Sequence, residues 1–237
     1  MGPSPSTAHP RPTQPRSQGA AIIAALLLSP LVNLLINRAL DRSWHGQSVP
    51  SIGLGPGHWL FGLSTVMVAA IGTVLLLWCV GRRLRPGRQS RWLLELLGAI
   101  TTVQALLNGA LVMIAISSYQ IGSLFLLLIG AGLYAVLNAI FLFWYWCLDH
   151  PDFGRGQPRF PTTSDDPRRG LIAFPEGDKA GSLIDYLYFT VLSSNTLGPP
   201  ENHQINGDHL KLVQLSQSIS MLVLLVVVVA RAINTLG

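Results

Sequence analysis

Long apolar runs separated by shorter polar segments dominate this chain. Five such runs lie at about residues 20–40, 58–80, 92–117, 121–148 and 212–236. Each reaches the roughly 20 residues that a helix needs to cross about 30 Å of hydrocarbon. The pattern therefore predicts an all-α polytopic membrane protein with five transmembrane helices.

A shorter amphipathic stretch, residues 182–194, precedes the last run and leads into a polar turn, Asn195 to Glu201. A short helix, a polar turn and then a spanning helix form the arrangement of a re-entrant pore loop. Non-helical backbone is tolerated at membrane depth only where protein buries it or water reaches it. We therefore expect one re-entrant pore-type helix and turn in addition to the five spans. Ser182 and Asp185 are expected to cap this helix and to complement its dipole.

These patterns divide the chain into four parts. Residues 1–19 are rich in Pro, Ser and Thr and predict a disordered N-terminal tail. Residues 20–148 form a four-helix transmembrane region, whose first run is long and has no clear cleavage site after it, so we expect a retained span. Residues 149–181 carry five prolines and predict an irregular polar loop. Residues 182–237 contain the re-entrant helix, a filter-like turn and the last span.

Composition agrees with a membrane protein and helps to orient it. Hydrophobic residues make up 49% of the chain and charged residues only 11%, whereas soluble domains carry roughly 25% charged residues. The net charge of +5 comes from basic residues between apolar runs, which argues against nucleic-acid binding. With a cytoplasmic N-terminus, most Lys and Arg residues, including five in the turn 81–91, fall on the inner side. We therefore expect a multi-pass protein of the bacterial inner (plasma) membrane with its re-entrant turn entering from the cytoplasm.

The chain carries no signature of an enzyme or of a metal site. Cys79 and Cys147 form neither a disulfide framework nor a metal-ligand spacing. Hydrolase, zinc-protease, phosphate-loop and dinucleotide motifs do not occur. His203, Asp208 and His209 lie close together in sequence but match no metal motif. We expect no catalytic activity, no metal and no cofactor.

The polar turn resembles part of a potassium-channel filter. Asn195-Thr196-Leu197-Gly198 is similar to the start of Thr-Thr-Val-Gly-Tyr-Gly-Asp, and Glu201 stands where that family has Asp. The stretch from Asp185 onward resembles channel pore helices of the Asp-Ala-Leu-Tyr-Phe type. The resemblance covers about 55 residues and implies a homo-oligomer, a tetramer by analogy, in which carbonyl oxygens contact monovalent cations. In it the Thr196 hydroxyl and the carbonyls of residues 195–197 contact the ion, and Gly198 lets the chain turn.

The turn departs from that family at its second half. Pro199 and Pro200 occupy the Tyr and second Gly positions. Proline, fixed near a φ of about −65°, cannot adopt the backbone angles that glycine permits there. The outer half of a potassium filter cannot be built, so we expect weak selectivity. Entry from the cytoplasm resembles the inverted pore of ionotropic glutamate receptors.

A second resemblance covers more of the chain and concerns uncharacterised bacterial membrane proteins. These share a basic turn, a helical hairpin, a Phe-Pro pair, an Asp-Phe-x-Tyr-Phe-Ser/Thr-like helix and a final span with Asn near its end. The matching residues are Phe174-Pro175, Asp185, Tyr188-Phe189-Thr190 and Asn234. That family has no settled activity, so the resemblance implies architecture only.

Polar residues in the spans admit two interpretations. Gln214, Gln217, Ser218 and Met221 share one helical face, which could line a water-filled path or make hydrogen bonds between helices. Glu201 could join a ring of carboxylates that attracts cations, or stand alone in solvent. Hydrogen bonding between helices is expected for most of the other intramembrane amides, which are Asn33, Asn37, Gln104, Asn108 and Asn138. The aromatic residues 144–146 are expected to be interface anchors.

We expect a channel-like protein that conducts monovalent cations with weak selectivity through an oligomeric pore in the bilayer. The expected ion-pathway residues are Asn195, Thr196, Leu197, Gly198, Glu201, Gln214, Gln217 and Ser218. One alternative is a non-conducting integral membrane protein with a degenerate pore fold that acts as an interaction or assembly partner, which the double proline favours. Another is a proton or solute carrier with Glu95 as relay, which the lack of an internal repeat disfavours.

Overall fold

The computed structural model describes residues 16–45, 65–77, 91–118, 123–149, 171–174 and 181–236. This part of the chain is nearly all helical. Its labelled elements are α1 (Arg16–His45), α3 (Arg91–Ser118), α4 (Ser123–Asp149), β1 (Ile172–Ala173), α5 (Leu183–Thr196), β2 (Gln204–Ile205) and α6 (Asp208–Leu236). A further, shorter helix spans Thr65–Leu77.

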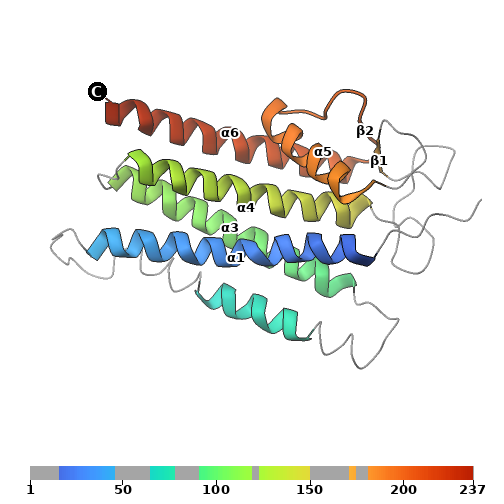
Figure 1. Ribbon diagram of the computed structural model, residues 1–237, viewed down its shortest axis with the longest axis horizontal. Coiled ribbons are helices and arrows are strands. Elements are labelled where there is room, and N and C mark those ends of the chain that lie inside the picture. The colour runs from blue at the N-terminus through green and yellow to red at the C-terminus, as the bar shows by residue number, and fades with distance from the viewer. Residues whose placement is uncertain are drawn as a thin grey trace, which may run out of the picture.

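The four long helices lie side by side in one bundle (Figure 1). Helix α4 is central, since it packs against α1, α3 and α6. Helices α1, α3 and α6 begin at the end of the bundle where α4 finishes with Asp149 (Figure 1). We call this end, which also holds β1, β2 and the start of α5, the Asp149 end. The long helices therefore pass between the Asp149 end and the opposite end of the bundle.

Four helices are long and apolar enough to cross a membrane, and they indicate a multi-pass membrane protein. Their spans are Gly19–Ile36, Trp92–Ala110, Leu126–Asp149 and Asp208–Ala230. The expected span at 58–80 corresponds to the shorter helix Thr65–Leu77, and its flanks lie outside the described residues. A fifth span therefore stays a prediction.

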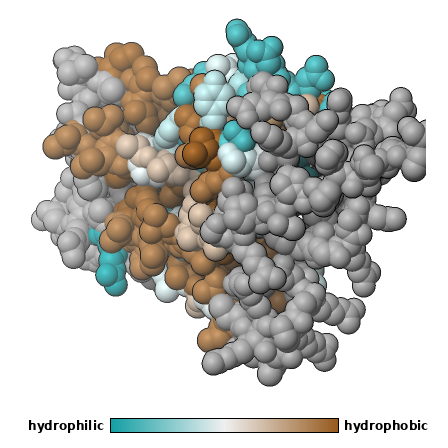
Figure 2. Space-filling view, turned by 45° about the vertical axis from the view of Figure 1, so that its right-hand side comes forward, coloured by the Kyte–Doolittle hydropathy of each residue, from teal (hydrophilic) through white to brown (hydrophobic). Residues whose placement is uncertain are grey.

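The surface of the bundle is largely apolar. Figure 2 shows brown, hydrophobic residues over most of the described surface of one face, with hydrophilic residues gathered near its upper edge. Large exposed side chains come from every long helix, for example Leu35, Leu106, Leu127 and Leu225, each more than half exposed. Soluble monomers rarely expose continuous apolar surface of this kind. The core is apolar as well, with Leu26, Leu97, Val136, Ile140 and Phe143 buried between helices.

The structure differs from the sequence expectation at two boundaries. Residues 16–19, expected in the disordered tail, already belong to α1, and residues 1–15 lie outside the described part. The loop expected at 149–181 contains strand β1, which pairs antiparallel with β2 through Ile172 opposite Ile205. A two-residue strand is too short to show an alternating pattern, so the sequence did not predict it.

The two-stranded sheet joins the segment before α5 to the segment after the polar turn. The Asn206 N–H also donates to the Leu171 carbonyl at 2.7 Å, next to the paired strands. The segment that enters α5 and the segment that leaves the polar turn therefore lie at the same end of the bundle.

Candidate functional site

Helix α5 begins with a reciprocal cap. The Ser182 Oγ accepts a hydrogen bond from the Asp185 N–H at 3.2 Å, and the Asp185 carboxylate accepts one from the Ser182 N–H at 2.6 Å. This capping box satisfies two backbone donors that the first turn of a helix leaves free. The cap expected at Ser182 and Asp185 is confirmed, and it fixes where α5 starts.

Asp149 anchors α5 and β1 to the end of α4. Its carboxylate is buried and accepts hydrogen bonds from the Tyr186 hydroxyl and from the Ile172 N–H, the latter at 2.7 Å. Burial raises the pKa of Tyr186 well above its ordinary value, and the Asp149 charge acts in the same direction. Tyr186 therefore keeps its hydroxyl proton and donates a hydrogen bond to Asp149. Our reading of the sequence missed this anchor, although an acidic residue that ends a helix against its dipole is a signal for one.

An aromatic cluster holds the chain before α5 against the helix. The Phe174 ring lies edge-on to Tyr186 at 5.3 Å between ring centroids and to His203 at 5.6 Å, and it also meets Phe189. A Cβ added at Gly181 would lie 2.5 Å from this ring, so the close approach requires glycine. Phe174, which carried the resemblance to the bacterial family, thus positions α5. The adjoining Pro175 lies outside the described residues.

Buried polar side chains join α4, α5 and α6 further along the bundle. The Tyr145 hydroxyl donates to the Gln217 Oε1 at 2.7 Å. The Gln217 Nε2 donates to the Ser194 Oγ at 2.7 Å and to the Thr190 carbonyl at 2.9 Å. The Ser194 hydroxyl lies 2.6 Å from the Asn138 Oδ1. We call Asn138, Tyr145, Thr190, Ser194 and Gln217 the junction network.

The junction network satisfies polar groups that would otherwise be costly inside the bundle. Tyr145, Gln217 and Ser194 each donate a hydrogen bond to the next side chain in the series. The Asn138 Nδ2 ends it by donating to the Tyr134 carbonyl at 2.9 Å. Buried networks of this kind specify one arrangement of helices when every member is paired. The expectation that residues 144–146 anchor at an interface is wrong for Tyr145 and Trp146, which are 0% and 2% exposed. Gln217 of α6 and Phe189 of α5 cover Tyr145, whereas Trp146 lies against α1 near Gly19, which the local sequence could not reveal.

The hydrogen bonds place the tip of α5 deep along α4. Tyr186 near its start bonds Asp149, Ser194 bonds Asn138, and the Asn195 Oδ1 accepts from the Tyr134 hydroxyl at 3.0 Å. Helix α5 therefore runs antiparallel to the last part of α4. Tyr134 lies about four turns, or about 22 Å, from Asp149 along the helix axis.

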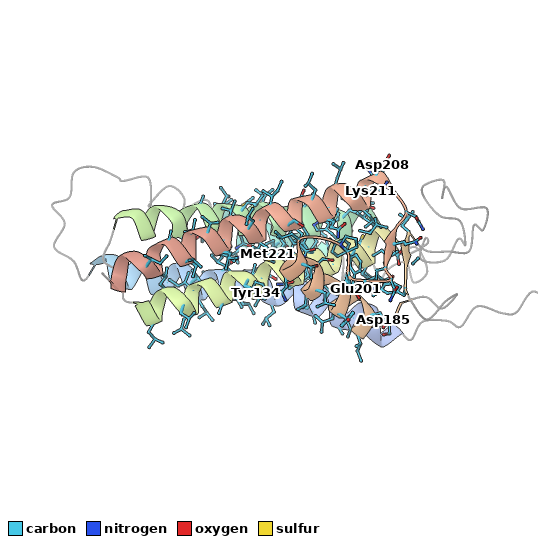
Figure 3. All side chains as sticks on the ribbon, turned by 90° about the horizontal axis from the view of Figure 1, so that it is seen from above. Tyr134, Asp185, Glu201, Asp208, Lys211 and Met221 are labelled. Carbon is cyan, nitrogen blue, oxygen red and sulfur yellow. The ribbon has the colours of Figure 1, made fainter. Side chains whose placement is uncertain are left out.

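Figure 3 shows the same relation along the bundle. Tyr134 and Met221 lie at a similar level, and Glu201 lies between that level and Asp185. The chain thus runs in along α4, turns after Thr196 and returns to the Asp149 end (Figure 1).

The polar turn is not an extended strand. Asn195 and Thr196 are the last residues of α5, and Leu197 follows in the left-handed region with φ 56° and ψ 23°. The Thr196 hydroxyl lies 2.8 Å from the Leu192 carbonyl and 2.9 Å from the Gly198 carbonyl. We expected Gly198 to let the chain turn, but the positive φ falls on Leu197. Left-handed backbone is unfavourable for residues other than Gly, Asn and Asp.

The expected ion-pathway residues fall into two environments. Asn195, Thr196, Leu197 and Glu201 are exposed on the turn, and Gly198 is half-buried. On α6, Gln217 is completely buried in the junction network, whereas Gln214 and Ser218 are half-buried. These contacts favour helix-to-helix hydrogen bonding over pore lining for Gln217. The structure brings Gln217 to Ser194, immediately before the turn, and in that way couples α6 to it.

Comparisons with known proteins find no matching family model, no matching curated protein and no matching solved structure. The two resemblances therefore stay predictions. Within the described ranges, no three His, Cys, Asp or Glu side chains gather closely enough to hold a metal ion.

Proposed function

We propose that this protein is a pore-type membrane subunit whose oligomer conducts monovalent cations with weak selectivity. In this proposal α5 is a re-entrant helix, α4 is the outer helix and α6 is the inner one. One observation carries the proposal: the exposed polar end of α5 lies about 22 Å along α4 from Asp149.

Exposed polar groups at that depth need a partner other than lipid. The hydrocarbon core of a bilayer is about 30 Å thick, so the tip of α5 would lie past its middle if Asp149 is at the surface. Lipid tails cannot hydrogen-bond the exposed Asn195 side chain or the backbone of the turn. Water or another protein copy must cover them. Several copies arranged around an axis would supply both, because their turns would then enclose a water-filled path.

The electrostatics of α5 favour a cation in that path. The carboxyl end of a helix carries partial negative charge on its last carbonyl groups. No basic residue lies in the last turn of α5 to neutralise this charge. Glu201, which is exposed on the returning segment, adds a full negative charge. Pro199 and Pro200 preclude a complete potassium filter, so discrimination between monovalent cations is weak.

We infer that α5 enters from the cytoplasmic side of the inner membrane. Arg16, Arg91 and Lys211 all lie at or near helix starts that share the Asp149 end (Figure 1). Basic residues that flank spans favour the cytoplasm. The N-terminus is then cytoplasmic as well.

A flux measurement on reconstituted protein tests conduction. Uptake of rubidium ions into liposomes is compared for the wild type, Gly198→Val and Gly72→Val. A Cβ at Gly198 would meet only the Thr196 carbonyl oxygen, at 4.0 Å, and one at Gly72 would meet no atom within 4 Å, so the two positions are matched in the space around an added Cβ. We expect uptake by the wild type and by Gly72→Val, with Gly198→Val near the level of protein-free liposomes. Equal leak from all three proteins, or a strictly monomeric protein in native mass spectrometry, contradicts the proposal.

A second candidate is a non-conducting membrane protein with a degenerate pore fold that serves as an assembly partner. It is favoured by the helical conformation of Asn195 and Thr196, which directs their carbonyls along the helix instead of around an axis. The Thr196 hydroxyl is also engaged within its own turn. An oligomer in native mass spectrometry without cation uptake supports this candidate.

A further inference from the structure

A second group of buried polar side chains lies on α1 and α3, outside the junction network. Asn33 of α1 and Gln104 of α3 are both 0% exposed. Neither the nitrogen nor the oxygen of either amide has a hydrogen-bond partner among the residues that the structure describes. Buried polar atoms without a partner are rare in native proteins because each one retains its full desolvation cost. Four such atoms on two side chains require an explanation.

The two amides belong to matching stripes on neighbouring helices. Ser29 and Asn33 lie as far from the start of α1 as Gln104 and Asn108 lie from the start of α3. Helices α1 and α3 are in contact and begin at the same end of the bundle (Figure 1). Residues four apart share one face of a helix. We call these four side chains, all at most 2% exposed, the amide ladder.

Nearby backbone adds a further acceptor. Pro30 lies inside α1 and has no N–H, so the helix cannot supply the usual donor to the buried Leu26 carbonyl. The Ser29 hydroxyl makes only a long contact, 3.4 Å, to the Ala25 carbonyl of its own helix. The α1 side of the ladder therefore offers a backbone acceptor that its own helix does not pair.

The balance of donors and acceptors identifies the ligand class. Asn33 and Gln104 together present two NH₂ groups and two carbonyl oxygens. A cation would pair only with the oxygens and an anion only with the nitrogens, whereas water donates and accepts. Buried water of this kind typically makes about three hydrogen bonds to otherwise unsatisfied groups. We propose that the amide ladder binds ordered water between α1 and α3, held by Asn33 and Gln104 and reaching the Leu26 carbonyl.

Stability measurements separate a hydrated ladder from a dry one. If water pairs with the amides, Asn33→Leu and Gln104→Leu each remove a partner of that water and leave the remaining amide incompletely hydrogen-bonded. Each change then lowers the melting temperature by about 2–4 °C. If the ladder is dry, each change removes unpaired atoms and raises the melting temperature, which overturns the proposal. Val103→Leu is the matched control, because Val103 lies on α3 and is exposed. It should leave the melting temperature almost unchanged.

Hydroxyl-radical footprinting of the wild type in lipid nanodiscs detects the water directly and needs no variant to fold. Radicals formed from bound water oxidise adjacent side chains, so we expect oxidation at Leu26 and Pro30 by mass spectrometry, and its loss in the double Leu variant. Destabilised variants without such oxidation would mean that the amides pair with each other, and the proposal fails. A melting temperature that shifts when sodium is replaced by a large organic cation would mean that the ladder binds a cation, and the proposal fails too. The inference is independent of conduction.

Discussion

Two fully buried glutamines show how differently one bundle treats the same side chain. Gln217 on α6 makes hydrogen bonds to Tyr145, Ser194 and the Thr190 carbonyl. Gln104 on α3 has no partner for either end of its amide within the described part of the chain. Both are 0% exposed, so burial alone does not separate them. The difference is whether a further polar segment enters the space that the side chain faces.

Helix α5 is that segment. It brings the Ser194 hydroxyl and the Thr190 carbonyl to Gln217, and its start brings the Tyr186 hydroxyl to Asp149. Between α1 and α3, two regular helices face each other, and regular helices use their own backbone groups internally. An amide placed there finds a partner only in another side chain, in a carbonyl such as that of Leu26, or in water. The comparison links the proposed pore unit and the proposed hydrated ladder through one requirement, the supply of hydrogen-bond partners.

The largest loss of stability should come from replacing Asp149, which anchors α5 and β1 to the end of α4. In Asp149→Ala the Tyr186 hydroxyl and the Ile172 N–H lose a charged acceptor while they remain buried. Hydrogen bonds to charged groups are worth about 1.5–3 kcal/mol each, so we expect a loss of about 3 kcal/mol or more in unfolding free energy. Reversible unfolding in mixed micelles measures it.

Asp185→Ala is the control for Asp149→Ala. Asp185 forms a local capping bond at the start of the same helix, and its loss should cost clearly less. If the two variants are equally stable, Asp149 is not the anchor of α5.

The second effect tests the junction network itself. Gln217→Leu keeps the volume roughly constant but leaves Tyr145, Ser194 and the Thr190 carbonyl without their shared partner. We expect a loss of about 1–3 kcal/mol, larger than for Gln104→Leu, where water can rearrange. Thermal unfolding of the two variants side by side gives the ranking.

Gln214→Leu is the matched control for Gln217→Leu on the same helix. The Gln214 side chain is half-buried, and its Nε2 has no hydrogen-bond partner in the described ranges. Because that nitrogen is unpaired, its removal should leave the melting temperature unchanged or slightly raised. A larger loss from Gln214→Leu than from Gln217→Leu would contradict the role we give to the junction network.

Local pattern was sufficient for much of this fold. The apolar runs predicted the four long helices, and Ser182 with Asp185 predicted where α5 begins. The polar turn from Asn195 to Glu201 predicted the break between α5 and α6, although the positive φ falls on Leu197 and not on Gly198. These features depend on a few neighbouring residues or on a single long period, which a sequence displays directly.

The parts that escaped prediction depend on tertiary packing. The sequence predicted a polar loop starting at Asp149 and an interface anchor at Tyr145. Both residues are buried by segments distant in sequence, Asp149 by β1 and α5 and Tyr145 by α5 and α6. The pairing of Ile172 with Ile205 joins segments that flank a helix and has no local signal. Conversely, the sequence placed Gln217 on a polar stripe of the last span but could not distinguish a pathway from a packing contact.

A smaller loss of stability, from Ser182→Ala, distinguishes the cap of α5 from the contacts that α5 makes in the junction network. Ser182→Ala removes the acceptor for the Asp185 N–H and should cost about 1 kcal/mol. The junction network stays intact, so the variant should keep its cation uptake if the wild type conducts. Thermal unfolding and the liposome assay are run on the same preparation. Lost uptake with unchanged stability would mean that the start of α5 acts on the path directly, against our separation of the two regions.

The smallest effect is a gain and tests whether the turn is strained. Leu197 holds a φ of 56°, which costs roughly 1–2 kcal/mol for a residue with a Cβ, and its side chain is 50% exposed. Leu197→Gly relieves the strain but adds freedom to the unfolded chain, so a net gain of a few tenths of a kcal/mol to about 1 kcal/mol is expected. Asn202→Gly, at a φ of 63° that asparagine tolerates, is the matched control and should gain less.

Residues held in an unfavourable backbone conformation tend to cluster at functional sites. If the conformation of Leu197 serves the cation path, Leu197→Gly should be more stable than the wild type and yet change the rate of rubidium uptake, while Asn202→Gly leaves uptake unchanged. A gain in stability with unaltered uptake would assign the strain to the C-cap of α5 alone. A loss of stability in Leu197→Gly would mean that packing of the covered half of the Leu197 side chain stabilises the fold by more than the left-handed backbone destabilises it. The turn would then resemble the junction network, where packing partners outweigh local preference.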